Sequence, residues 1–215
     1  VSLYLALFSA VIATVLGTAA SLGIASMGRK SRLLVTNITY ITTVNPEIIT
    51  GISLMMLFVA YQRFASELDF LPDNIMGFPT LLIAHITFNI PYVILSVGPK
   101  LRQMDRNLVD AAMDLGCTWM QAFWKVIIPE IKPGIVSGAL TAFTMSIDDF
   151  VISYFTAGSS SSTLAMTIYG MTKKKVTPEI NAISTLLFVT VLVLLAVINV
   201  REARQERKLA AEQRR

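Results

Sequence analysis

The chain has 215 residues, of which 54% are hydrophobic and only 15% charged, whereas about a quarter of the residues in a soluble domain are charged. This composition argues against a water-soluble enzyme and favours a membrane protein. The single cysteine, Cys117, and the single histidine, His85, exclude a disulfide within the chain and a zinc site of Cys and His ligands. We therefore expect no metal and no cofactor.

Five apolar stretches are long enough to cross a bilayer, which takes about 20 residues of helix. They cover residues 3–27, 33–61, 75–97, 134–157 and 180–200. The predicted fold is all-α, a polytopic bundle of transmembrane helices that forms one domain over residues 1–215. The chain opens on Val1 and an apolar stretch without the basic leader of a signal peptide, so we expect a missing upstream piece that contains a further span.

The positions of Lys and Arg predict the orientation, because cytoplasmic loops are enriched in both. Fourteen of the 18 lie in the connections 28–32 and 98–132 and in the tail 201–215, and the other four are Arg63 and Lys173–Lys175. We therefore place the 98–132 connection and the C-terminus in the cytoplasm. The basic tail lacks interleaved aromatic residues and a recognised module, so its predicted surroundings are the lipid bilayer and solvent, with no nucleic acid.

Three patterns that could indicate catalysis fail in detail. Segment 23–31, GIASMGRKS, approaches a phosphate-binding loop, but Arg29 precedes the lysine and a span stands where a strand is needed. Asp148 and Asp149 are neighbours about 100° apart on a helix, so they do not form the facing pair of an aspartyl protease. The lone His85 is typical of a hydrogen bond between helices. We predict no catalytic residue in this chain, so another subunit would have to handle any ATP.

The cytoplasmic connection 98–132 contains an amphipathic segment, residues 105–129, predicted as a helical hairpin or a bent helix. Its apolar stripe repeats every four residues and comprises Ala111, Leu115, Trp119, Phe123 and Ile127. Gly116 is the expected bend and Pro129 the expected stop. Acids on the polar face, Asp110 and Asp114, favour a protein partner over the membrane surface. Packing of the hairpin on its own bundle is the alternative.

The spacing within this segment resembles the EAA loop of permease subunits of binding-protein-dependent ABC importers. The family pattern is Glu-Ala-Ala, three residues, Gly, nine residues and Ile-x-Leu-Pro. Here it appears as Asp110, Ala111, Ala112, then Gly116, then Val126, Ile127, Ile128 and Pro129. The resemblance implies that this loop forms the coupling helix in a groove of the ATPase, with Asp110, Ala111, Ala112, Gly116 and Pro129 at the contact. A glycine permits the close backbone approach that such a contact needs.

Four more segments, residues 45–58, 84–94, 144–158 and 176–187, resemble the PotC-like permease subunits of spermidine/putrescine importers. That family has the type I (MetI-like) importer fold with six spans, of which this chain would have the second to the sixth. The resemblance implies a multi-pass protein of the bacterial inner membrane. It also implies three kinds of partner: a second permease subunit in a heterodimer, cytoplasmic ATP-binding subunits and an external substrate-binding protein.

The predicted spans contain three acids and no bases. Glu47 and Asp148 each lie about 21 Å from the cytoplasmic start of their span, which favours a cationic cargo over an anion. We predict a substrate pathway lined by Asp148, Asp149, Glu47 and Tyr154, with the aromatic ring contributing a cation–π contact to an ammonium group.

Several alternatives stay open for these acids. Either aspartate could pair with a base of a partner permease, cap a broken helix or face the external binding protein, and Glu47 follows Pro46 and could belong to a helix break. The cargo could be another cation, such as an opine-type compound or iron(III). An alternative from a different functional class is a membrane channel or scaffold that is not coupled to ATP.

Overall fold

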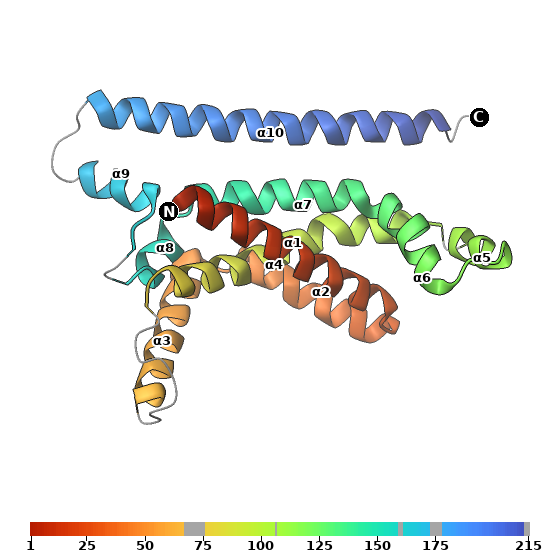
Figure 1. Ribbon diagram of the computed structural model, residues 1–215, viewed down its shortest axis with the longest axis horizontal. Helices are drawn as coiled ribbons and strands as arrows, with labels where there is room; N and C mark the ends of the chain where they lie inside the picture. The colour runs from red at the N-terminus through yellow and green to blue at the C-terminus, as the bar shows by residue number, and fades with distance from the viewer. Residues whose placement is uncertain (67–75, 106, 159–160, 173–177, 213–215) are drawn as a thin grey trace.

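The computed structural model describes residues 1–66, 76–105, 107–158, 161–172 and 178–212 (Figure 1). All the secondary structure in these ranges is helical. The long helices are α1 (Ser2–Ser26), α2 (Arg29–Val44), α3 (Glu47–Ser66), α4 (Phe78–Gln103), α7 (Ile128–Asp148) and α10 (Pro178–Glu212). The shorter ones are α5 (Asn107–Asp114), α6 (Trp119–Ala122), the π-helix η1 (Phe123–Ile127), α8 (Val151–Thr156) and α9 (Leu164–Thr172).

Helices α1, α4 and α7 form the core of the bundle and contact one another most extensively (Figure 1). Glycines permit this close approach, as is common between membrane helices. A Cβ atom on Gly17 of α1 would lie 2.7 Å from the side chain of Val93 on α4. A Cβ atom on Gly134 of α7 would lie 2.8 Å from the carbonyl oxygen of Ser96, also on α4. Small residues therefore set the distances between the three core helices.

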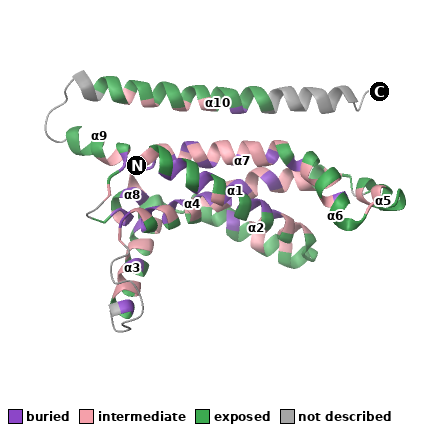
Figure 2. Cartoon of the chain, in the orientation of Figure 1, coloured by how far each residue is buried: buried purple, intermediate pink, exposed green. Residues whose placement is uncertain are grey.

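Five helical stretches are long and apolar enough to span a membrane, as the sequence predicts. They are Ser2–Ser26, Glu47–Ala65, Phe78–Gln103, Trp119–Asp148 and Asn181–Arg201. Large apolar side chains cover their outer surfaces, and α10 is exposed along nearly all of its described length (Figure 2). This distribution fits a bundle whose exterior contacts lipid or other subunits.

The second predicted span, residues 33–61, is not one helix, and this prediction is corrected. The chain leaves the helical conformation at Asn45, which has φ −63° and ψ 135°. Pro46 explains the break, because it lacks an N–H group and disfavours a helical conformation in the residue before it. As a result α2 and α3 run in different directions (Figure 1), and only Glu47–Ala65 qualifies as a span.

The fourth predicted span, residues 134–157, also differs from the helix in the structure. Its helix begins earlier, since α6, η1 and α7 follow one another without a break, and it ends at Asp148, before the separate helix α8. The prediction that Pro129 stops a helix is therefore wrong. Pro129 lies directly after the π-helical turn η1, where the regular α-helical hydrogen-bond pattern is already interrupted within a continuous helix.

The α1–α2 junction, the α5–α6 hairpin and the C-terminal end of α10 lie toward the same end of the molecule (Figure 1). We call this the basic end, because it brings together the connections 28–32 and 98–132 and the start of the tail. Arg106 and Lys173–Lys175, which entered the orientation argument, lie outside the described residues, as do the side chains of residues 202–215.

Candidate functional site

Glu47, Asp148 and Asp149 line one cavity of about 290 Å³, which we call the acidic cavity. Both helix breaks contribute to it. Glu47 is the first residue of α3, directly after the break at Pro46, and Asp148 is the last residue of α7. The other lining residues are Phe88, Met145, Phe150 and Val151. Because no lining residue among those described is basic, the cavity favours a cation.

The two adjacent aspartates have different environments. Asp148 is exposed and also lines a neighbouring cavity of about 370 Å³ together with residues of α9 and α10. Asp149 is only 6% exposed, and its carboxylate accepts hydrogen bonds from the backbone N–H groups of Ile152 (3.2 Å) and Ser153 (2.8 Å). Asp149 therefore caps the first turn of α8, which was one of the alternatives for these acids.

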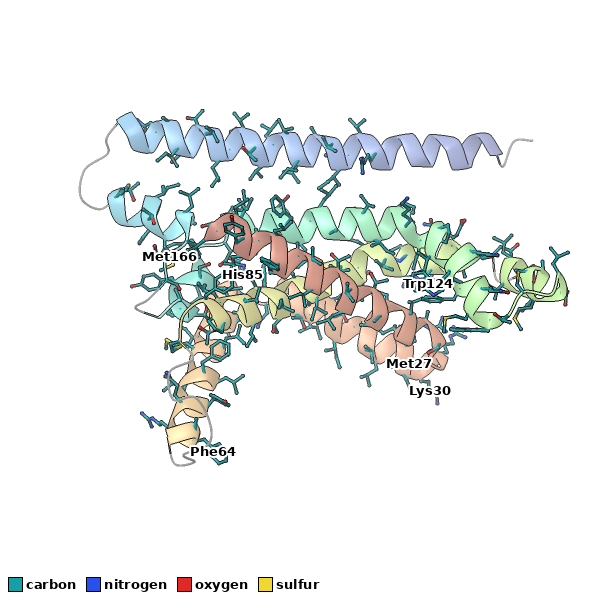
Figure 3. The ribbon with its side chains drawn as sticks, viewed as in Figure 1. Met27, Lys30, Phe64, His85, Trp124 and Met166 are labelled. Atoms are coloured by element: carbon teal, nitrogen blue, oxygen red, sulfur yellow. The ribbon has the colours of Figure 1, made fainter. Side chains whose placement is uncertain are left out.

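A buried polar network surrounds His85, which lies inside the bundle (Figure 3) and contacts Asp149. The His85 Nε2 atom lies 3.0 Å from the Ser153 Oγ and 3.5 Å from the Asp149 Oδ2, and its Nδ1 atom lies 2.6 Å from the Ser146 Oγ. The Ser146 hydroxyl in turn lies 2.9 Å from the Ser9 hydroxyl. The expected interhelical role of His85 is confirmed, and the network joins α1, α4, α7 and α8.

The sequence argument missed most of this network. Ser9 and Ser146 are ordinary small residues within apolar spans, and their only signal was a hydroxyl in an otherwise apolar stretch. The aromatic residues of the acidic cavity were also absent from the predicted set. Phe88 follows His85 by almost one helical turn, so the face that holds the histidine already pointed to it.

Tyr154 is 58% exposed and does not line the acidic cavity. Its ring lies 5.5 Å from that of Phe150, which does line the cavity and which also lies 4.3 Å from the ring of Tyr169. The aromatic group next to the acids therefore includes Phe150 and the two tyrosines in ring contact with it, Tyr154 and Tyr169.

The hairpin at the basic end bends at Gly116, as predicted. Gly116 has φ +88°, in the left-handed region that glycine adopts without a steric penalty. The N–H group of Gly116 donates to the carbonyl of Met113 (2.9 Å), and that of Cys117 donates to the carbonyl of Ala112 (3.1 Å), which terminates α5. Thr118 then caps α6.

The hairpin presents an apolar surface to the outside. None of the residues of α5 is buried, and Leu115 is 87% exposed. Asp110, Ala111 and Gly116 are exposed and Ala112 is half-buried, so each of these motif positions is at least partly accessible. Pro129 lies apart from them, at the start of α7. The later part of the segment does contact the bundle, since Ala122 is buried and Ile127 packs against the core, so the alternative holds for that part and not for the exposed α5.

Five apolar spans in a helical bundle with an exposed hairpin at one end define a polytopic α-helical membrane protein. The family described as "Binding-protein-dependent transport system inner membrane component" matches residues 10–210, and the chain belongs to this family. It is therefore an inner membrane protein with several spans.

Curated relatives carry names from polyamine transport. The chain is 40% identical over 188 residues to the putrescine transport system permease protein PotI of Escherichia coli K12, covering 86% of this chain and 65% of PotI. It is 34% identical over 193 residues to the spermidine/putrescine transport system permease protein PotC of the same organism, covering 90% of this chain and 69% of PotC. The chain thus spans about two thirds of the length of each.

Among solved structures, a chain from the inward-facing methionine ABC transporter MetNI matches with a TM-score of 0.68. The match covers 94% of this chain and 92% of that one, at 19% sequence identity. At that identity the likeness establishes the fold, which is the predicted type I importer fold.

Proposed function

We propose that this chain is a permease subunit of an ATP-driven importer that moves spermidine, putrescine or both across the bacterial inner membrane. The observation that carries the proposal is the acidic cavity, where two helix breaks bring Glu47 and Asp148 together and none of the described lining residues is basic. A polyamine is a flexible chain of ammonium groups, for which carboxylates and aromatic faces are the physical match. The names of PotI and PotC support the same cargo.

Within this proposal the acids have distinct roles. Glu47 and Asp148 contact the ammonium groups of the substrate as it passes. Asp149, held by α8 and by His85, fixes the end of α7 and so positions Asp148. The aromatic group around Phe150, which includes Tyr154, extends the cation-binding surface away from the acids. No covalent chemistry takes place in this chain.

The hairpin supplies the connection to ATP. We assign its exposed surface, with Asp110, Ala111, Ala112 and Gly116, to contact with a cytoplasmic ATP-binding subunit. This assignment places the basic end and the C-terminus in the cytoplasm, in agreement with the distribution of Lys and Arg. Pro129, at the start of α7, connects the hairpin to the core and not to the ATPase itself.

The remaining partners follow from the family and from the exposed exterior. A second, different permease subunit encloses the substrate from the other side, and an external binding protein delivers it. ATP binding and hydrolysis in the cytoplasmic subunits move the hairpins, which alternately open the pathway to each side of the membrane. Because α7 continues directly from the hairpin, a displacement of the hairpin reaches Asp148 through one helix of the core.

Uptake of labelled spermidine and putrescine tests the proposal in a transport-deficient strain that expresses the full-length protein with its neighbouring subunits. We expect Glu47→Gln and Asp148→Asn each to raise the KM for uptake about tenfold or more, since a hydrogen bond to a charged group contributes about 1.5–3 kcal/mol. Glu130→Gln is the matched control, because Glu130 is an exposed acid in the first turn of α7, far from the cavity. An unchanged KM in both cavity variants contradicts the pathway.

Competition and energy dependence separate the alternatives. If unlabelled polyamines inhibit the uptake and iron(III), an opine and sulfate do not, the result supports a polyamine as the substrate. Competition by iron(III) or an opine assigns the cavity to another cation. Flux that survives ATP depletion indicates a channel and rejects the importer.

The hairpin has its own test. Gly116→Asn keeps the left-handed backbone accessible but adds a side chain, whereas Gly116→Trp adds a bulky one. We expect both to reduce ATPase capture in a pull-down, the tryptophan more, while the protein stays inserted. Gly170→Trp is the control, because a Cβ atom there also meets nothing within 4 Å and α9 lies at the other end of the molecule. Full capture by Gly116→Trp contradicts this assignment.

A further inference from the structure

A cavity of about 730 Å³ lies at the basic end, away from the acids; we call it the basic cavity. It is formed by the last turns of α1, one face of α2 from Arg32 to Tyr40, the last third of α4 and the hairpin. Its volume falls within the range of about 300–1,000 Å³ found for small-molecule sites. The segment 23–31, which fails as an ATP-binding loop, contributes residues 23–26 to its wall.

The charged lining residues of the basic cavity are both arginines. Arg32 and Arg102 line it, and none of its described lining residues is acidic. The Arg32 Nη2 atom donates to the carbonyl oxygens of Ala25 (2.8 Å) and Met27 (3.0 Å), which holds the guanidinium group against the end of α1. Its Nε atom is buried and has no hydrogen-bond partner among the described residues. The buried Nε atom does not face the cavity, so an anion there would pair with the exposed Arg102 and with the positive charge of the Arg32 guanidinium group.

Most of the remaining wall is apolar or aromatic. Leu22, Ile94, Leu95 and Ile127 also line the cavity, and Tyr40, Trp119 and Phe123 contribute aromatic rings. A small inorganic anion would leave this wall without a partner. The combination of two guanidinium groups and an apolar wall fits an anion that carries a hydrocarbon part.

The depth of the basic cavity fits a lipid. On α4 the lining extends from Ile94 to Met104, which is about 15 Å along a helix axis. It begins within the apolar span and ends at the basic end of α4, beside Lys100 and Arg102. Trp119 is 58% exposed there, and tryptophan is enriched at membrane interfaces.

We infer that the basic cavity binds an anionic phospholipid. The phosphodiester group pairs with Arg102 and Arg32. The acyl-chain segments next to the headgroup lie against α1 and α4. Basic pockets between transmembrane helices are known to take lipid headgroups in this way. Because Trp119 and Phe123 belong to the hairpin, the lipid braces the hairpin against the core. The inference depends on the orientation of the chain in the membrane and not on which substrate it carries.

Lipid retention tests this site in the purified complex of the full-length protein with its partner subunits. The complex is reconstituted in nanodiscs of phosphatidylcholine and phosphatidylglycerol, extracted in detergent, and its retained phosphatidylglycerol is counted by mass spectrometry. We expect Arg102→Gln to lose most of the retained lipid. Arg29→Gln, which removes the same charge from an exposed position on α2 outside the cavity lining, retains it.

A second variant tests the volume of the site without changing its charge. A Cβ atom on Gly98 meets nothing within 4 Å, and Gly98 lines the basic cavity, so Gly98→Leu extends into it. We expect this variant also to lose the lipid while the complex still assembles. Equal retention of phosphatidylglycerol by the wild type, Arg102→Gln and Gly98→Leu overturns the inference.

Two further measurements identify other occupants. Inorganic phosphate that raises the melting temperature of the detergent-solubilised wild type but not of Arg102→Gln, with no effect of phosphatidylglycerol, assigns the arginines to a free anion and rejects the lipid. A photoreactive amino acid at Thr36, in the cavity wall, distinguishes the last case. Its crosslinking to a protein subunit in place of lipid shows that a partner fills the cavity, which also rejects the inference.

Discussion

The adjacent acids Asp148 and Asp149 give the sharpest prediction, because one sits in an exposed position and the other inside the bundle. We expect Asp149→Ala to destabilise the protein, and Asp148→Ala to leave its stability nearly unchanged while impairing uptake. The sequence treats the two residues as equivalent neighbours. The structure separates them through the break that ends α7 and begins α8.

The magnitude follows from the contacts of Asp149. Its carboxylate accepts two backbone N–H groups, of Ile152 and Ser153, and lies 3.5 Å from the Nε2 atom of His85. Loss of a helix cap costs about 0.5–2 kcal/mol, and donors left buried without an acceptor move the cost toward the upper end. In a protein of this size 1 kcal/mol corresponds to about 2–4 °C. Asp149→Ala should therefore lower the melting temperature by about 2–8 °C.

The assay heats the purified complex in detergent and follows the fraction that stays monodisperse in size-exclusion chromatography. Asp149→Asn keeps one oxygen acceptor and should fall between the wild type and Asp149→Ala. Uptake kinetics on the same variants complete the comparison, since Asp148→Ala should raise the KM at an unchanged melting temperature. Equal melting temperatures for Asp148→Ala and Asp149→Ala would refute the division between a substrate contact and a structural cap.

Three further predictions concern packing and backbone. Gly134→Ala places a Cβ atom 2.8 Å from the carbonyl oxygen of Ser96 and should cost about 1–3 kcal/mol in thermal unfolding, whereas Gly170→Ala, with open space around it, should not. His85→Leu removes the contacts with two serine hydroxyls and should lower the melting temperature, with partial recovery in His85→Asn; no shift in either variant would show that the network contributes little. Gly116→Ala adds a Cβ atom at a backbone position with φ +88°, which alanine adopts less readily than asparagine does. It should therefore reduce ATP-dependent uptake more than Gly116→Asn does, and the opposite order would count against the left-handed bend.

Local signals made part of the fold predictable. Each span is an apolar run whose length the bilayer fixes, so composition and length alone indicated five spans. Three of them lie within several residues of their predicted positions, whereas the predicted second and fourth spans crossed helix breaks. The bend of the hairpin was equally local, because Gly116 combines a break in the amphipathic pattern with the residue that best adopts a positive φ. The spacing from Asp110 through Gly116 to Pro129 was enough to indicate the family.

The helix breaks show where local reasoning ended. Pro46 gave warning of the first, yet hydropathy alone joined both sides into one span. The second helix break, at Asp149, has no proline or glycine beside it that would indicate a break. It depends on a carboxylate that caps α8 and on His85, which reaches it from α4, 64 positions earlier along the chain.

The sequence by itself determined that this is a membrane-spanning helical protein. It also showed which connections between the spans carry most of the Lys and Arg residues, and which loop carries the family motif. Those properties depend on composition and on residues a few positions apart. Only the tertiary structure decided that Glu47 and Asp148 share a cavity while Asp149 supports the fold, and that Arg32 and Arg102 line another cavity with aromatic residues of the hairpin. Such groupings depend on how whole helices pack. Close contacts between residues that are far apart in the sequence, such as Gly17 with Val93, set that packing.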